Sequence, residues 1–189
     1  SYPKSGNTWV RSFISTYYFS NNENFEFEYL KNIKQFPHEK FFKKKIKDIN
    51  EAIQNWDNAQ KNIISKNKII FLKTHSALMN INNYHFTNEK NSVAGIYIVR
   101  DPRNVITSLS NHYSINFEDS LKFMTSKKKY IIDDSVKEIN YGNFQFISSW
   151  AENYRSWKYY KKFKILIIKY EDLENRTLDT FLEIISFIN

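Results

Sequence analysis

Residues 1–9 read Ser1-Tyr2-Pro3-Lys4-Ser5-Gly6-Asn7-Thr8-Trp9, and apolar residues recur at helical spacing directly after them. A lysine, a serine and a flexible glycine ahead of a helix place backbone N–H groups and the positive end of the helix dipole around an anion. The stretch therefore predicts a phosphate-binding loop that opens a helix from about Asn7. Taken alone, Lys4-Ser5-Gly6 also fits a solvated turn.

The loop is not a Walker A motif. That motif, G-x-x-x-x-G-K-[ST], places its lysine directly after a glycine, whereas Lys4 precedes the only glycine of this loop, Gly6. The departure weakens the assignment to a P-loop kinase or GTPase.

The amino-acid composition excludes several kinds of protein and site. The chain has 189 residues, 28 Lys and Arg against 20 Asp and Glu, and therefore a net charge of +8, which points to an anionic partner such as a nucleotide, a nucleic acid or an acidic glycan. Aromatic residues make up 17%, enough for a packed core rather than disorder. Because cysteine is absent, disulfides, cysteine-based metal sites and a thiol nucleophile are excluded.

The organisation is that of a single domain over residues 1–189. The sequence begins inside the expected loop and ends on an apolar helical pattern, so we expect the domain to be truncated at both ends. No apolar run approaches the ~20 residues that span a bilayer, and no signal-peptide pattern is present. We therefore expect a soluble, cytoplasmic protein, and nothing in the sequence decides its oligomeric state.

Three short apolar runs each end in polar residues and predict buried strands: 68–72, 93–99 and 165–168. Helical patterns are predicted over four ranges: 46–65, 102–113, 144–161 and 173–188. Strands that alternate with helices indicate an α/β protein, and we expect a P-loop-like three-layer fold with a central, mainly parallel sheet flanked by helices. Ligands bind beyond the carboxyl ends of such strands, where Lys4, Lys73, His75 and Arg100 are expected to converge.

Residues 1–9 resemble the Y-P-K-[ST]-G-[TN]-[TN]-W loop of sulfotransferases that use 3'-phosphoadenosine 5'-phosphosulfate (PAPS). Arg100 and Ser108, eight residues apart, resemble the 3'-phosphate motif of that family, and Lys73-Thr74-His75 resembles its K-T-H segment. Residues 149–157 resemble its S-W-x-x-H-[VY]-x-x-W helix with Asn153 in place of the usual His, and residues 169–173 resemble its Y-E-D-L strand end. The family's R-K-G-x-x-G-x-W-K segment does not occur in the chain.

The individual matches have simpler explanations. Arg100 and Ser108 also fit an ordinary helix start with a surface arginine, and a lone histidine such as His75 is more often a surface or core residue. Trp150, Tyr154 and Trp157 also fit helix packing, and Glu171-Asp172 fits a helix cap. The matches follow the family's order along the whole chain, which makes the combination more specific than any single motif.

The resemblance implies transfer of a sulfuryl group from PAPS, with release of the product nucleotide PAP, to a hydroxyl or amine of a small-molecule, lipid or glycan acceptor. It implies Lys4, Lys73 and His75 as catalytic residues: Lys4 on the departing phosphate, Lys73 on the sulfuryl oxygens and His75 as general base. The implied PAPS-binding residues are Lys4, Ser5, Gly6, Asn7, Thr8, Trp9, Arg100 and Ser108. No metal is expected, because the sequence has no spaced His and carboxylate cluster.

Other functions remain open from the residues alone. One is an atypical nucleotide or small-molecule kinase, and another is a basic nucleic-acid-binding module that uses Lys43–Lys45 and Lys127–Lys129. A sulfotransferase-like module without turnover is a third, against which the intact set Lys4, His75, Arg100 and Ser108 argues. The acceptor is expected to be bound by variable segments over 21–45, 76–91 and 116–140, whose composition ranks no acceptor class.

Overall fold

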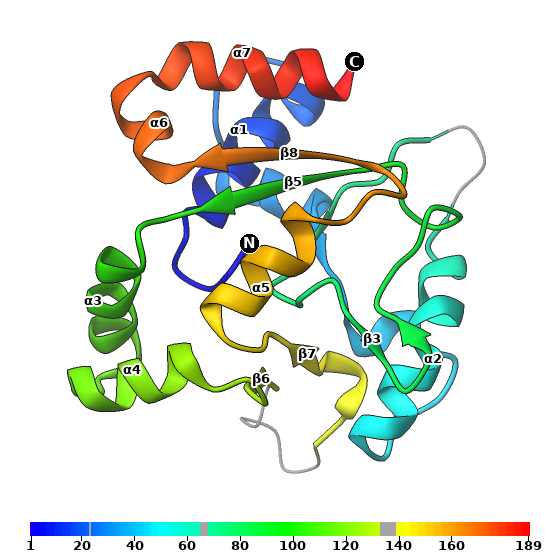
Figure 1. Ribbon diagram of the computed structural model, residues 1–189. Helices are drawn as coiled ribbons and strands as arrows, with labels where there is room; N and C mark the ends of the chain where they lie inside the picture. Colours follow the sequence, from blue (N-terminus) through cyan, green and yellow to red (C-terminus); the bar gives the residue numbers. More distant parts are fainter. Residues whose placement is uncertain (23, 65–67, 133–138) are drawn as a thin grey trace.

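A computed structural model describes residues 1–22, 24–64, 68–132 and 139–189 (Figure 1). Its helices and strands, in chain order, are α1 (Asn7–Phe19), η1 (Phe27–Asn32), β1 (Lys34–Gln35), η2 (Glu39–Phe41), α2 (Ile49–Lys61), β2 (Leu72–Lys73), β3 (Asn80–Ile81), β4 (Tyr84–His85), β5 (Ala94–Val99), α3 (Pro102–Tyr113), α4 (Phe117–Thr125), β6 (Tyr130–Ile131), η3 (Tyr141–Asn143), β7 (Gln145–Phe146), α5 (Trp150–Lys158), β8 (Lys164–Lys169), α6 (Tyr170–Asn175) and α7 (Thr177–Ile188). The η elements are single 3₁₀ segments. No helix in these ranges is long and apolar enough to cross a membrane.

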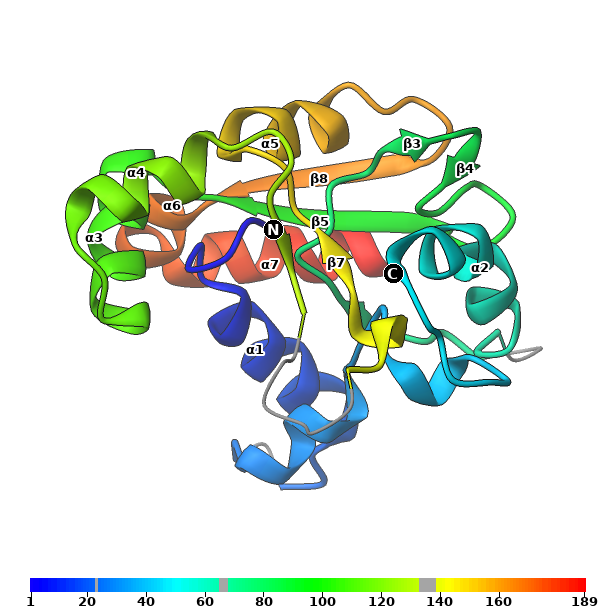
Figure 2. The same cartoon turned by 90° about the horizontal axis from the view of Figure 1, so that it is seen from below.

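The parallel pair β5–β8 lies in the middle of the molecule, with Ala94 opposite Lys164 and Val99 opposite Lys169. Figures 1 and 2 show α5 on one face of the pair and α1, α6 and α7 on the other. Layers of helix, strand and helix are thus present around two long parallel strands. The chain is an α/β protein, as predicted.

Residue alternation along the two strands explains the layers. Ile98 and Ile168 point to one face, where they pack with residues of α1, α6 and α7 such as Val10 and Ile184. Tyr97 points to the opposite face and packs in a second cluster that includes residues of α2 and α5. Because successive side chains of a strand face opposite sides, a pair covered on both faces is apolar throughout.

The expected central, mainly parallel sheet is not formed as one sheet among the described residues, whose strands make four two-stranded sheets. The predicted strand 68–72 is reduced to β2 (Leu72–Lys73), which pairs in parallel with β1. Ile69 and Ile70 are 64% and 41% exposed, because no strand in the described ranges pairs with them. The runs 93–99 and 165–168 are confirmed as β5 and β8.

The helix predictions hold in position but differ in length. Helix 102–113 is confirmed as α3, with Asp101 as N-cap and Pro102 as its first residue. The helix predicted over 46–65 is α2, which begins after Asp48, whose side chain accepts from the N–H of Glu51. The end predicted at Ser65 lies outside the described residues.

Two predicted helices were too long. The one predicted over 144–161 is α5 alone, because Ser148 has a left-handed backbone (φ 57°) and the Ser149 side chain caps the helix that follows. The one predicted over 173–188 is two helices, because Arg176 leaves the helical conformation (φ −138°, ψ 49°) between α6 and α7. The residues ahead of Ser148 form β7 instead, which pairs with β6.

One buried hydrogen bond ties β5 to α5. The Tyr97 hydroxyl donates to Oδ1 of Asn153 at 2.8 Å, and both side chains are at most 1% exposed. An acceptor buried without a donor costs more than the net gain from an average hydrogen bond. This pair therefore holds α5 against strand β5.

Tyr97→Phe removes the donor and leaves Asn153 Oδ1 buried without one. We expect the free energy of unfolding, measured by denaturant titration, to fall by about 1–3 kcal/mol. Tyr159→Phe is the matched control, because the Tyr159 side chain is 63% exposed and its hydroxyl bonds to no residue in the described ranges; it should change stability by less than about 0.5 kcal/mol. Equal unfolding midpoints for the two variants would contradict this role.

Candidate functional site

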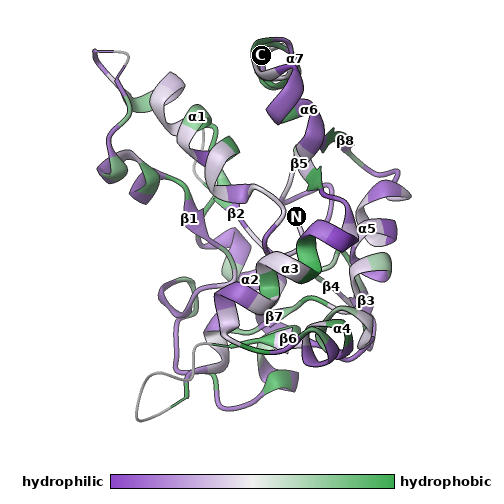
Figure 3. Cartoon of the chain, turned by 90° about the vertical axis from the view of Figure 1, so that its left-hand side faces the viewer, coloured by the Kyte–Doolittle hydropathy of each residue, from purple (hydrophilic) through white to green (hydrophobic). Residues whose placement is uncertain are grey.

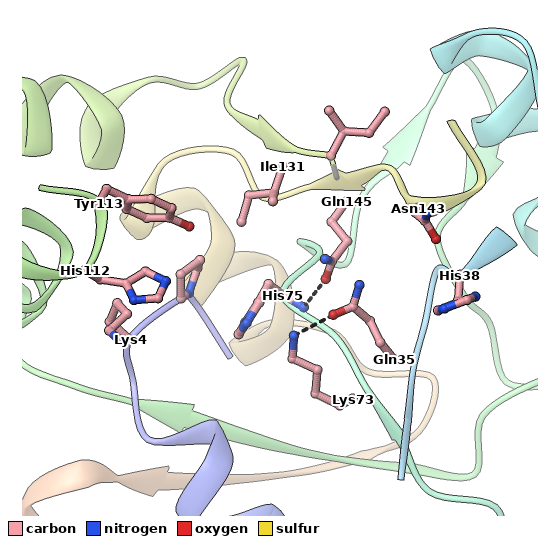
Figure 4. A pocket seen from close by; sticks show the side chains of 12 residues that line it. Lys4, Gln35, His38, Lys73, His75, His112, Tyr113, Ile131, Asn143 and Gln145 are labelled. Atoms are coloured by element: carbon pink, nitrogen blue, oxygen red, sulfur yellow. Dashed lines mark hydrogen bonds between the residues drawn. The ribbon is translucent and has the colours of Figure 1, made fainter. Parts of the chain in front are cut away.

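A cavity of about 410 Å³ opens beside the residue 1–6 segment, which lies near the centre of the molecule in all three views (Figure 3). Its walls come from four parts of the chain: the loop ahead of α1, the β1–β2 pair, the end of α3 and the β6–β7 pair with η3 (Figure 4). The lining residues are Pro3, Lys4, Gln35, His38, Lys73, His75, His112, Tyr113, Ile131, Ile132, Asn143 and Gln145. The three predicted catalytic residues therefore meet in one cavity.

The loop ahead of α1 has the backbone of an anion site. Lys4 and Gly6 both have positive φ, at 64° and 95°, so the chain reverses sharply before the helix begins. Gly6 is the N-cap of α1, no side chain caps the helix, and its first turn carries no acidic residue. The first N–H groups of the helix and its positive dipole end are thus left for a ligand.

Tyr170, the first residue of α6, connects this loop to Arg100. A Cβ on Gly6 would lie 2.6 Å from Cδ2 of the Tyr170 ring, so glycine is required there both by its positive φ and by the close approach. The Arg100 guanidinium lies over the same ring, 4.1 Å from its centroid, and Nη1 donates to the carbonyl of Lys4 at 3.1 Å. Arg100 thus supports the loop without lining the cavity.

Several polar atoms around the loop are buried and have no partner within the described ranges: Ser5 Oγ, Asn7 Oδ1 and Arg100 Nε. Two of them, the hydroxyl of Ser5 and Nε–H of Arg100, are hydrogen-bond donors. Buried donors without acceptors are rare in folded proteins. Their presence fits a site completed by an anion.

Lys73 reaches the cavity from the end of β2. Its ammonium group donates to Oε1 of Gln35 at 2.9 Å, across the parallel β1–β2 pair. Burial, with the Arg11 cation nearby, lowers the pKa of Lys73 from 10.5 to about 8. The group is therefore a cation at neutral pH that has lost much of its hydration and can bind an anionic group strongly.

His75 is held at both its backbone and its ring. Its N–H donates to Oε1 of Gln145 at 2.9 Å, and Nδ1 lies 2.8 Å from the carbonyl oxygen of Ser1. A carbonyl only accepts, so Nδ1 carries a proton and Nε2 of the neutral ring keeps its lone pair. Burial and the neighbouring Lys73 cation hold the pKa of His75 well below its ordinary value of 6.5. The neutral, proton-accepting form is thus favoured.

Asn153 stabilises the His75 segment from outside the cavity. Its Nδ2 donates to the carbonyl of His75 at 3.0 Å and to that of Ile147 at 2.8 Å, while Oδ1 accepts from Tyr97. Every polar atom of this buried amide is used. The residue that replaces the usual histidine of the resembled motif is therefore a positioning residue, one step removed from the cavity.

The remaining predicted residues lie around the cavity or away from it. Ser5, Gly6, Asn7 and Thr8 form the loop and the first turn of α1, whereas Trp9 packs edge-on against Tyr170 and Phe181. Ser108 lies half-buried on α3 and does not line the cavity. The acidic pair 171–172 lies in the first turn of α6, and Glu171 accepts from the N–H of Asp101.

Sequence reasoning missed several cavity residues. His38 and His112 had no motif around them, and Gln35, Asn143 and Gln145 lie in short strands or turns without periodicity. The variable segment 21–45 does supply Gln35 and His38, and segment 116–140 supplies Ile131 and Ile132. Segment 76–91 supplies no lining residue, and residues 133–138 lie outside the described ranges.

Within the described ranges, no group of three or more His, Asp or Glu side chains is placed to hold a metal ion.

Among curated protein sequences, no relative matches the chain. A family model described as the sulfotransferase domain matches residues 1–189, the whole chain. That family implies an α/β, P-loop-like fold and sulfuryl transfer in general, which agrees with the parallel pair and the loop that opens α1. The chain belongs to the sulfotransferase domain family.

Proposed function

We propose that this protein transfers a sulfuryl group from PAPS to a hydroxyl or amine of an acceptor, and that residues 1–189 act as one domain. The observation that carries the donor assignment is the uncapped N-terminus of α1, framed by Lys4 and Arg100, next to the cavity that holds Lys73 and His75. Sulfuryl transfer from a phosphosulfate requires a site for the anionic donor and a base that accepts the acceptor's proton. The start of α1 supplies the first, and His75 in the adjacent cavity supplies the second.

The buried donors of the loop fit the charge of PAPS. Oxygens of its 5'-phosphosulfate supply acceptors for the Ser5 hydroxyl and for the N–H groups of the first turn, including those of Asn7 and Thr8. Arg100, with Nε unpartnered, and Ser108 bind the 3'-phosphate, and Trp9 packs against adenine. The assignments of Ser108 and Trp9 rest on the family resemblance.

The chemistry then requires little beyond position and charge. PAPS supplies an activated sulfuryl group: its S–O bond to the 5'-phosphate breaks as the acceptor atom bonds to sulfur, and PAP leaves with the electron pair. His75 accepts the acceptor's proton at Nε2, the nitrogen left free by the Nδ1 contact with Ser1. Lys73 stabilises charge on the sulfuryl oxygens and Lys4 charge on the departing phosphate.

The alternative functions find less support. The Lys43–Lys45 run contains Lys44, which is paired with Glu51. In the other run, the Lys129 ammonium lies 4.2 Å from the centroid of the Phe123 ring. None of the six lysines lines the cavity. No contact in the described ranges favours a kinase.

Donor binding is tested by calorimetric titration with PAP, with Mg-ATP as control at the same salt concentration. We expect saturable binding of PAP, preferred over ATP. Lys4→Ala and Arg100→Ala should each weaken it about tenfold or more, because each removes a charged contact worth about 1.5–3 kcal/mol. Failure of the folded protein to bind PAP, or equal binding of ATP, would contradict the donor assignment.

The base is tested by His75→Ala. We expect the turnover number to fall about 10²–10⁴-fold, the usual contribution of a positioned general base, while the affinity for PAP stays within a few-fold. His85→Ala is the matched control, because His85 is exposed on β4 and does not line the cavity. A variant at His75 that turns over at the normal rate would eliminate this role.

The pH dependence follows from the two shifted groups. His75 must be neutral, and because its pKa is lowered, kcat/KM should stay high below pH 6.5 and fall only at lower pH. Lys73 must be charged, so kcat/KM should decline as pH rises through about 8. Lys73→Arg should remove that decline and leave the acidic limb unchanged, since arginine stays protonated. A wild-type profile that is flat from pH 7 to 10 would contradict the role of Lys73.

A further inference from the structure

Three carboxamide side chains line the cavity, from Gln35, Asn143 and Gln145, and they share one feature. The oxygen of each is already bonded to a donor of the chain. Oε1 of Gln35 accepts from Lys73 at 2.9 Å, Oε1 of Gln145 from the N–H of His75 at 2.9 Å, and Oδ1 of Asn143 from the N–H of Glu39 at 3.0 Å.

Those contacts fix which end of each amide faces the cavity. An ammonium or N–H group can bond only to the oxygen of a carboxamide, so the oxygen and nitrogen cannot be exchanged in any of the three. The NH₂ group of each carboxamide is free to donate to a ligand, because none of the three has an acceptor within the described ranges. Gln145 is also only 3% exposed, so its NH₂ group has little access to bulk water.

His38 adds a fourth donor. Its Nδ1 accepts from the N–H of Lys40 at 3.2 Å, so in the neutral ring the proton is on Nε2. Among the described residues that line the cavity there is no Asp or Glu, and Lys4 and Lys73 contribute two cations. The cavity is therefore rich in hydrogen-bond donors and poor in acceptors.

The three carboxamides and His38 extend from the middle of the cavity to one end (Figure 4). In Figure 4, Lys4 and His112 are at one end, Asn143 and His38 are at the other, and His75 and Lys73 lie between them. In-line transfer places the acceptor opposite the leaving oxygen, across the transferring group. With Lys4 on the leaving phosphate, the acceptor is bound at the end that holds His38 and Asn143.

We infer that the acceptor is a hydroxyl compound rich in hydrogen-bond-accepting oxygens, of which a saccharide is the representative, bound by the three carboxamides and His38. The inference rests on the proposed function and names its acceptor class. A flat apolar phenol would supply no acceptor for the NH₂ groups of the three carboxamides. An ammonium compound would meet the Lys73 cation, and no carboxylate among the described lining residues.

The test compares acceptors with PAPS held constant: phenyl β-D-glucuronide, phenyl β-D-glucoside, 2-naphthol and tyramine. We expect kcat/KM for both glycosides to be at least tenfold above that for 2-naphthol and for tyramine. A preference for 2-naphthol or for tyramine overturns the inference.

Asn143→Asp tests the carboxamides directly. The change keeps the oxygen that accepts from Glu39 and replaces the free NH₂ group by an oxygen, so the local fold is retained while a donor becomes an anionic acceptor. We expect the KM for the neutral glucoside to rise about tenfold, with kcat and the KM for PAPS unchanged. An unchanged KM for the glucoside overturns the proposed contact between Asn143 and the acceptor.

The matched control is Asn116→Asp. Asn116 also uses Oδ1 to accept a backbone N–H, that of Asp119 at 2.8 Å, but it caps α4 and does not line the cavity. It should leave all these constants unchanged. Calorimetry with PAP separates the two proposals: absence of PAP binding refutes the donor assignment itself. Binding of PAP without sulfation of either glycoside refutes only the acceptor class.

Discussion

The side chain of Asn153 joins strand β5, helix α5 and the segment that carries His75. One buried amide accepts from Tyr97 on β5 and donates to the carbonyls of His75 and Ile147. In a low-dielectric interior, a fully satisfied polar group specifies one arrangement, because every alternative leaves a partner unpaired. Hydrogen bonds through Asn153 thus connect His75 to strand β5.

Hydrogen bonds within the protein also orient polar side chains that line the cavity. Lys73 and the three amides are oriented by hydrogen bonds to other groups of the protein, which leaves their remaining hydrogens for a ligand. No described lining residue is a carboxylate, and Glu171 accepts from the backbone N–H of Asp101. A site that is organised before the ligand arrives avoids reorganising its dipoles during the reaction.

The sequence was sufficient where local chemistry decides the structure. The loop, the α1 start, α3 with its Asp101 cap and the β5 and β8 strands all follow from short-range patterns. It failed where tertiary partners decide. Ile69 and Ile70 have the pattern of a strand, but no strand in the part of the chain that the structure describes pairs with them, and Ser148 ends a helical pattern that composition alone would extend. Lys4, Lys73 and His75 were found through motifs, whereas Gln35 and Asn143 enter the cavity from short elements that carry no pattern.

The contact between Gly6, Tyr170 and Arg100 has a consequence for the dynamics of the chain. Tyr170 is the first residue of α6, so the ring that supports the loop is also the start of the C-terminal helices. A fluctuation that lifts α6 removes the support of the loop and uncovers Arg100 in the same event. The loop and the start of α6 are therefore expected to open together, so a ligand held at the loop should slow amide hydrogen exchange in α6 and α7.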